Sequence, residues 1–164
     1  MDNKAQYALE YILIMGFVSL IVFSFFPYVY DINELNTCMA AARNGALLGS
    51  GLDSFAIYPD DKFEYYMENH QRLKIGSKVV FVRLEFKKEE FDPIYKRTKI
   101  KLKIYASAPG VKNPKDRDCI GDRINYYARK SICEAFKKEH LTNIYYNPAF
   151  SDRYYITTSE VGWV

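Results

Sequence analysis

The sequence is poor in the residues that build metal and catalytic sites. It has two histidines and three cysteines in 164 residues, and no two cysteines have the Cys-x-x-Cys spacing of a metal or redox site. His70 and His140 lie in polar stretches and belong to no recognisable motif. Neither a glycine-rich phosphate loop nor a nucleophile elbow occurs. We therefore predict a protein that is not an enzyme and that uses no metal and no cofactor.

Charge is missing over one long stretch. No Asp, Glu, Lys or Arg occurs from Tyr11 to Tyr30, although 26% of the chain is charged and its formal net charge is +3. A run of about 20 apolar residues is long enough to cross a ~30 Å hydrocarbon core as a helix. The small positive excess comes without a base-reading motif, which gives no reason to expect a specific nucleic-acid partner. The sequence thus predicts one membrane-spanning helix at residues 11–30.

The residues around the run predict its orientation. Lys4 is the only Lys or Arg before it, and Arg43 is the first after it. The acids Asp31 and Glu34 follow the run directly. Because positive residues favour the cytoplasmic side, we expect a single-pass protein with a cytoplasmic N-terminus and the remaining chain outside.

Three interpretations of this N-terminal stretch compete. A secretory signal peptide needs small residues at the end of its apolar run, but that place holds Phe25, Phe26, Pro27 and Tyr28. An unprocessed membrane anchor needs only the run itself. The third interpretation is a signal that is cut on the cytoplasmic side, before the run, and the residues at the head of the run favour it.

The segment QYALEYILI, residues 6–14, resembles the class III signal of archaeal type IV pilin-like proteins, which is written QxSxExxxL. Gln6 and Glu10 match this pattern. Ala8 stands where Ser is usual, and Ile14 stands where Leu is usual. The resemblance covers the N-terminal helix and none of the C-terminal domain.

The resemblance implies a processing site and an assembly role. A prepilin peptidase would cut between Ala5 and Gln6, with Lys4 as the basic residue beside the cut, and would remove residues 1–5 as a leader. Glu10 would then be the fifth residue of the mature chain, the position at which pilins carry an acid. Pro27 lies at a depth where many pilins also have a proline.

Glu10 also has a physical role that can be stated without the family. A carboxylate inside a membrane helix costs on the order of 2.5–3.5 kcal/mol, less near the end of the apolar run. Cutting before Gln6 creates an α-amine with an ordinary pKa of about 7.7–8.0. Pairing Glu10 with that amine of a neighbouring subunit would neutralise both groups and set the register between subunits. The alternative places Glu10 at the membrane interface, favoured by the positive end of the helix dipole.

The helix is expected to continue beyond the membrane. Apolar residues recur at steps of three and four as far as Ala46, and Gly49-Ser50-Gly51 supplies a stop signal. A helix from Gln6 to about Leu48 would be roughly 64 Å long, and Pro27 should kink it. We expect its small-residue stretch at 39–46 to pack against a sheet. The stripe consists of Ile32, Leu35, Met39, Ala42 and Ala46.

The C-terminal part, residues 52–164, reads as an α+β head domain with a mainly antiparallel sheet. Strands are predicted at 55–58, 78–86, 98–106 and 153–158, and a helix at 122–140, with a loop over 108–118. Asp92-Pro93 marks a turn, and the second and third strands are near enough to form an antiparallel hairpin with a long loop. In the second strand, Val80, Val82, Leu84 and Phe86 are expected to form the buried face. In the third, Ile100, Leu102, Ile104 and Ala106 are expected to face inward and three lysines outward.

Two further groups have open interpretations. Lys96, Arg97, Lys99, Lys101 and Lys103 form either a patch for an acidic partner or a solvated strand face protected by lysine. Cys119 and Cys133 could close a disulfide outside the cell, in which case the cross-link adds up to about 3 kcal/mol. The alternatives are buried thiols, or a bond from Cys38 that ties the long helix to the head.

These observations together predict a structural subunit, a pilin or minor pilin, of an archaeal type IV pilus-like surface filament. Its expected partners are other pilin-like subunits, the prepilin peptidase, and membrane lipid before assembly. The alternative is an unprocessed single-pass surface protein whose head binds a ligand or a partner.

Overall fold

The long N-terminal helix is present. The structure, a computed structural model, describes residues 3–51 and 78–164, with side chains described from Gln6 onward. Helix α1 extends over Asn3–Gly51 and continues through Pro27. The described helix ends at Gly51, the last residue of the predicted Gly49-Ser50-Gly51 stop and three residues beyond the expected end near Leu48. Gly49 and Ser50 are buried inside the helix. Tertiary packing outweighs the low helix propensity of glycine there.

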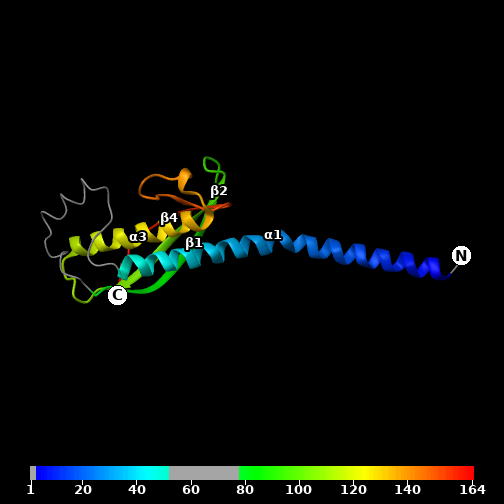
Figure 1. The fold of residues 1–164 in the computed structure, drawn as a ribbon, viewed down its shortest axis with the longest axis horizontal. Coiled ribbons are helices and arrows are strands. Elements are labelled where there is room, and N and C mark those ends of the chain that lie inside the picture. The colour runs from blue at the N-terminus through cyan, green and yellow to red at the C-terminus, as the bar shows by residue number, and fades with distance from the viewer. Residues whose placement is uncertain (1–2, 52–77) are drawn as a thin grey trace. The chain divides into compact units, whose positions relative to one another are not determined.

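The chain divides into two compact units, which we describe separately. The first, Met1–Leu35, contains the apolar part of α1. The second, Asn36–Val164, contains the end of α1, the sheet and helix α3 (Figure 1). The strand predicted at 55–58 lies outside the described residues.

The second unit has an α+β fold with a five-stranded mixed sheet, as predicted. Strand order is β1-β2-β4-β3, and β5 pairs with the far end of β2. The β1–β2 and β3–β4 pairs are antiparallel, while β4 and β5 run parallel to β2. The bounds are β1 Val80–Asp92, β2 Arg97–Ser107, β3 Ala149–Phe150, β4 Tyr154–Thr158 and β5 Gly162–Trp163.

Strand β2 is the centre of the sheet and follows its predicted alternation. Ile100, Leu102, Ile104 and Ala106 have no exposed surface, whereas Lys101 and Lys103 are exposed. Strand β1 reaches the turn directly, so the β1–β2 loop is a tight turn and not the long loop that was expected. A residue after the Asp92-Pro93 signal, Lys96, takes a positive φ of 51° to close it.

The buried face predicted for β1 is correct at Leu84 but wrong at Val80 and Val82, because the strand contains a bulge. The register with β2 shifts between Phe81 and Arg83, so one extra residue is accommodated there. Phe81 and Leu84 pack against the core, while Val80 and Val82 are about half exposed. A bulge changes which residues face inward, and strict alternation does not show where one occurs.

Helix α3 begins earlier and ends earlier than predicted, at Pro114–Phe136. The Asn113-Pro114 pair, interpreted as a loop signal, starts the helix. The Asn113 side chain accepts a hydrogen bond from the Lys115 N–H at 3.1 Å, and Pro114 occupies the first turn, where a missing N–H costs nothing. Lys137 ends the helix in the left-handed conformation, and His140 lies in a short 3-10 helix, η2 Glu139–Leu141.

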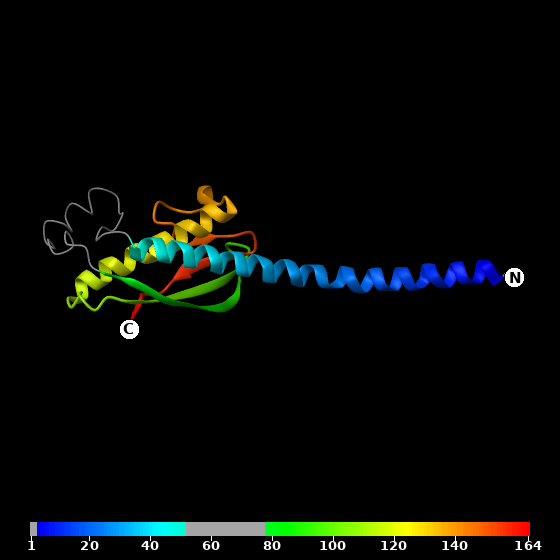
Figure 2. The same cartoon turned by 60° about the horizontal axis from the view of Figure 1, so that its bottom comes forward.

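The end of α1 and helix α3 lie side by side on one face of the sheet (Figures 1 and 2). Ala46 of α1 belongs to the same core cluster as Ile104 of β2 and Ile124 of α3. The glycines of α1 face α3 more closely than the sheet. A Cβ on Gly45 would lie 2.2 Å from the Tyr127 carbonyl oxygen, and one on Gly49 would lie 2.9 Å from Ile124 Cα. The two glycines let the helix backbones approach each other closely.

The proposed Cys119–Cys133 disulfide is wrong. Both residues lie on α3, fourteen positions apart, which corresponds to about 21 Å along a helix at 1.5 Å per residue. A disulfide needs Cα atoms within about 7 Å. Cys38, Cys119 and Cys133 are all buried thiols, and burial raises the pKa of the Cys133 thiol. They serve as small apolar residues of the core.

The helix contact gives a stability prediction. Gly45→Ala should lower the free energy of unfolding by about 3 kcal/mol or more, because the new methyl group would overlap a backbone carbonyl. Thermal or denaturant unfolding of the head would measure this. Gly51→Ala in the same helix is the matched control, since no atom of the described residues lies within 4 Å of its Cβ position. Equal stability of the two variants would contradict the close packing of α1 and α3.

Candidate functional site

The first candidate site is the apolar part of α1. Every large apolar side chain from Tyr7 to Tyr30 is exposed, from 44% at Ile21 to 70% at Ile12. Within the described residues, α1 is long and apolar enough to span a membrane from Gln6 onward. Such a surface is unstable in water. It therefore weakly indicates a membrane anchor, and the same test is also passed by a signal sequence.

Polar groups in this segment are satisfied within the helix where they can be. The Ser19 and Ser24 hydroxyls donate to the carbonyl oxygens of Met15 and Ile21 at 2.8 and 2.7 Å. These bonds spare the hydroxyls from facing hydrocarbon without a partner. The part of the segment that follows Glu10 is therefore compatible with an apolar environment along its whole length.

Gln6 and Glu10, the two residues that match the signal pattern, lie on one face of α1. Their spacing of four residues places them one helical turn apart, and Gln6 Nε2 donates to Glu10 Oε1 at 3.3 Å. Lys4 and Ala5 are in the helix by their backbone. Both Gln6 and Glu10 are exposed, so the carboxylate is accessible to a second group.

The second candidate site is the outer face of the sheet, opposite the two helices. Charged residues cover it in cross-strand register: Glu85 lies opposite Lys103, and Lys87 lies opposite Lys101. Lys99 forms an ion pair with Glu89 at 2.9 Å, and Arg83 pairs with Glu85 at 3.0 Å. The predicted row of lysines on β2 is therefore present, but acids of β1 neutralise part of it.

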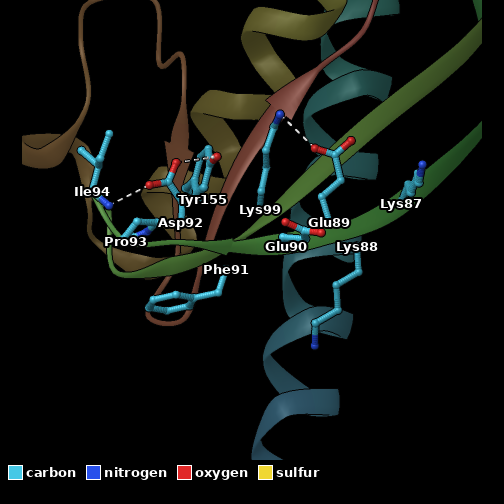
Figure 3. Close-up of a pocket in the computed structure, with 10 residues that line it drawn as sticks. All are labelled: Lys87, Lys88, Glu89, Glu90, Phe91, Asp92, Pro93, Ile94, Lys99 and Tyr155. Atoms are coloured by element: carbon cyan, nitrogen blue, oxygen red, sulfur yellow. Dashed lines mark hydrogen bonds and ion pairs between the residues drawn. The ribbon is translucent and has the colours of Figure 1, made fainter.

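A shallow cavity of about 900 Å³ lies where this face meets the β1–β2 turn. Figure 3 shows Asp92 and Tyr155 facing each other beside Lys99 and Glu89, with Phe91 and Lys88 on the other side of the strand. The Tyr155 hydroxyl donates to Asp92 Oδ2 at 3.0 Å, and the Ile94 N–H donates to Asp92 Oδ1 at 2.7 Å. Glu89, Glu90 and Asp92 line the open cavity but are not arranged to hold a metal ion, so its main visible role is to hold the turn.

Hydrogen bonds favour the ionised form of two carboxylates in this cavity, Asp92 and Glu89. The hydrogen bond from the Ile94 N–H, followed by that from Tyr155, keeps the pKa of Asp92 below its ordinary value. The hydrogen bond from Lys99 does the same for the pKa of Glu89 and raises the pKa of Lys99. Burial, and then the bond to Asp92, raises the pKa of Tyr155.

Sequence reasoning missed the Asp92–Tyr155 pair. Asp92 was interpreted only as a turn residue, and Tyr155 only as part of a strand. The pair joins residues 63 positions apart, because β4 runs parallel to β2 and places Tyr155 beside Lys99. No local signal indicates this pairing, whereas the Asp92 bond to the Ile94 N–H follows from ordinary turn chemistry.

Among the described residues, no group of three or more His, Cys, Asp or Glu side chains is arranged to hold a metal ion. Searches of protein-family models, curated proteins and solved structures found no match to the chain. The functional argument therefore rests on the residues themselves.

The Asp92–Tyr155 bond gives a pH prediction. Tyr155→Phe should raise the pKa of Asp92 towards its ordinary value, because one bond to the ionised form is lost. The stabilisation from Asp92 is present above its unfolded-state pKa and is lost as the pH falls through the folded one. The variant should therefore lose it at a higher pH than the native protein does.

Carboxyl-carbon NMR titration would measure both acids in one sample. Glu89 is the internal control, because its lowered pKa depends first on Lys99 and should hardly move. An unchanged pKa of Asp92 in the variant would show that the tyrosine hydroxyl does not stabilise the carboxylate.

Proposed function

We propose that the chain is a structural subunit, a pilin or minor pilin, of an archaeal type IV pilus-like surface filament. One observation carries this proposal. Gln6 and Glu10 lie one turn apart at the head of an apolar helix surface that begins at Tyr7, and the same helix continues into the core of a folded head. This order of signal residues, apolar helix and head resembles that of pilin-like proteins.

The mechanism is association and not catalysis. Lipid would cover the apolar part of α1 before assembly, and the same part of other subunits would cover it afterwards. This part of α1 has eighteen large apolar side chains. Burying each one contributes about 1.5–3 kcal/mol relative to its exposure to water. A state in which water covers this surface is therefore unstable. Lipid and helix partners are similarly apolar, so packing and polar pairing decide between them.

Glu10 provides such a polar pairing. After cleavage before Gln6, the α-amine of one subunit can reach the carboxylate of a neighbour only at one axial offset. A buried ion pair adds little net stability but strongly penalises arrangements that leave a charge without a partner. Register is therefore the main contribution of Glu10, and exposure of its side chain is consistent with this role.

The second candidate is an unprocessed single-pass surface protein with a partner-binding head. The exposed, mixed-charge outer face of the sheet favours it as a place where a partner could bind. In this case the helix remains in lipid, residues 1–5 remain attached, and no filament forms.

Processing is the test that separates the two. Mass spectrometry of the protein from cells that contain a prepilin peptidase should find Gln6 as the first residue. The matched control is Gln6→Leu, which alters the residue after the cut and should leave the chain unprocessed. A native chain that begins at Met1 or Asp2 would contradict the filament proposal and favour the anchored protein.

Assembly tests the role of Glu10. Glu10→Val should reduce the number of filaments seen by electron microscopy at least about tenfold, because an amine left without its carboxylate in an apolar core costs about 3–5 kcal/mol. Glu90→Val, which makes the same change at an exposed position of the head, is the control. If Glu10→Val forms filaments as well as the control does, the register role is wrong.

A further inference from the structure

Strand β1 forms an edge of the sheet. Among the described residues it pairs with β2 alone, although it is the longest strand of the sheet at 13 residues. An edge strand presents a row of backbone N–H and C=O groups to any strand that can lie beside it. Its two bulges, near Val82 and between Lys88 and Phe91, leave a regular window from Arg83 to Lys88.

Charges of alternating sign lie on the outer face of this window and at Glu89, the residue that follows it. Arg83, Glu85, Lys87 and Glu89 follow one another at every second position, and Glu89 extends the row because it pairs with Lys99 on the same face. Edges protected against pairing commonly carry lysines, which repel a second copy. A row of charges of alternating sign does not repel the same row of a second chain when the register places opposite charges across from each other.

One antiparallel offset satisfies the whole row. If two β1 strands lie side by side with Phe86 at the centre, each Glu85 lies opposite Lys87 of the second copy. Each Arg83 then lies opposite Glu89 of the second copy. Moving the centre to Glu85 places Glu85 opposite its own copy and Arg83 opposite Lys87, and moving it to Lys87 places Lys87 opposite its own copy and Glu85 opposite Glu89. Like charges directly opposite are destabilising, so the row selects a single register.

Lys87 gives a reason for the contact. It lies directly opposite Lys101 of β2, a like-charge pair that weakens the β1–β2 ladder. Arg83 and Glu89 already have carboxylate or ammonium partners within the chain. Glu89 interacts electrostatically with both lysines. A further carboxylate, on the side of β1 where no other described strand lies, would offset their repulsion more fully, and Glu85 of a second copy supplies it.

The inner side of the edge has room for the partner's side chains. A groove of about 460 Å³ is lined by Met39 and Arg43 of α1 and by five residues of β1, from Phe81 to Phe86. Val82 and Phe86 are 45% and 46% exposed there. In the register centred on Phe86, the two Phe86 rings meet at the centre of the contact, where apolar burial adds to the backbone pairing.

We propose that β1 is a self-association edge, at which a second copy of this chain adds its own β1 in antiparallel register centred on Phe86. The contact is two-fold symmetric and closes with two copies. It therefore cannot propagate a filament, and it goes beyond the proposed function. In a filament it would link subunits of two separate assemblies, and in an anchored protein it would pair two heads.

Cysteine cross-linking tests the register in the full chain in detergent micelles. A residue at the centre of a two-fold contact lies opposite the same residue of the second chain. Under mild oxidation, Phe86→Cys should therefore form a covalent dimer. Val82→Cys has the same exposure but would lie opposite Glu90 of the second copy, and should not form one. The native cysteines are buried, and the unsubstituted chain controls for them. Absence of the Phe86→Cys dimer, or equal yields from both variants, would overturn the proposal.

Charge reversal tests the partner and is read out in the Phe86→Cys background. Lys87→Glu or Glu85→Lys alone should reduce the dimer yield about tenfold, because each creates two like-charge contacts. A mixture of the two variants should restore the yield, since each then meets opposite charges. Lys112→Glu, an exposed lysine in a loop, should have no effect. If the mixture does not restore the dimer yield, self-recognition by the charges of β1 is contradicted. None of these outcomes bears on processing at Gln6, which is tested separately.

Discussion

The close approach of the two helices on the sheet is the constraint on which the head depends. Gly45 and Gly49 leave no room for a side chain between α1 and α3, and Arg123 Nε donates to the Gly49 carbonyl at 2.8 Å from the facing helix. The core cluster of α1, α3 and β2 follows from this contact, because Ala46 and Ile124 reach the same side of the sheet only when the helices lie close. The same contact makes the end of α1 part of the head and not an independent spacer.

One helix therefore carries two surfaces that suit different surroundings. From Asn36 onward, α1 buries small residues, including Cys38, Ala42 and Ala46, whereas from Tyr7 to Tyr30 it exposes large apolar ones on all sides. A helix that is apolar all round belongs in lipid or among other helices. A helix with a small-residue face belongs against a partner at short distance. Both surfaces belong to one continuous helix, Asn3–Gly51.

The elements with strong local signals were predictable from the sequence, and those that depend on tertiary pairing were not. The alternation of β2 and the apolar run of α1 were predicted correctly because each is a simple period in the sequence. The Gly49-Ser50-Gly51 signal predicts the end of α1 to within three residues, but it does not show that α3 covers Gly49. The start of α3 was missed because Asn-Pro fits both a loop and a helix N-terminus. The parallel β2–β4 pairing, and with it the Asp92–Tyr155 bond, left no local trace.

Two features of the chain are unfavourable in a single copy and favourable in an assembly. Glu10 places a carboxylate at the head of an apolar helix, where only Gln6 of the described side chains is seen to donate to it. Lys87 faces Lys101 across β1 and β2, at an edge where β1 has a neighbouring strand on one side only among the described residues. In the two proposed contacts a second copy of the chain would supply a group of opposite charge: the α-amine that cleavage before Gln6 would create in one case, and Glu85 in the other. The two proposed contacts differ in symmetry, because the first would repeat along an assembly and the second would close with two copies. A chain with both would grow in one direction through its helix and associate laterally through its sheet.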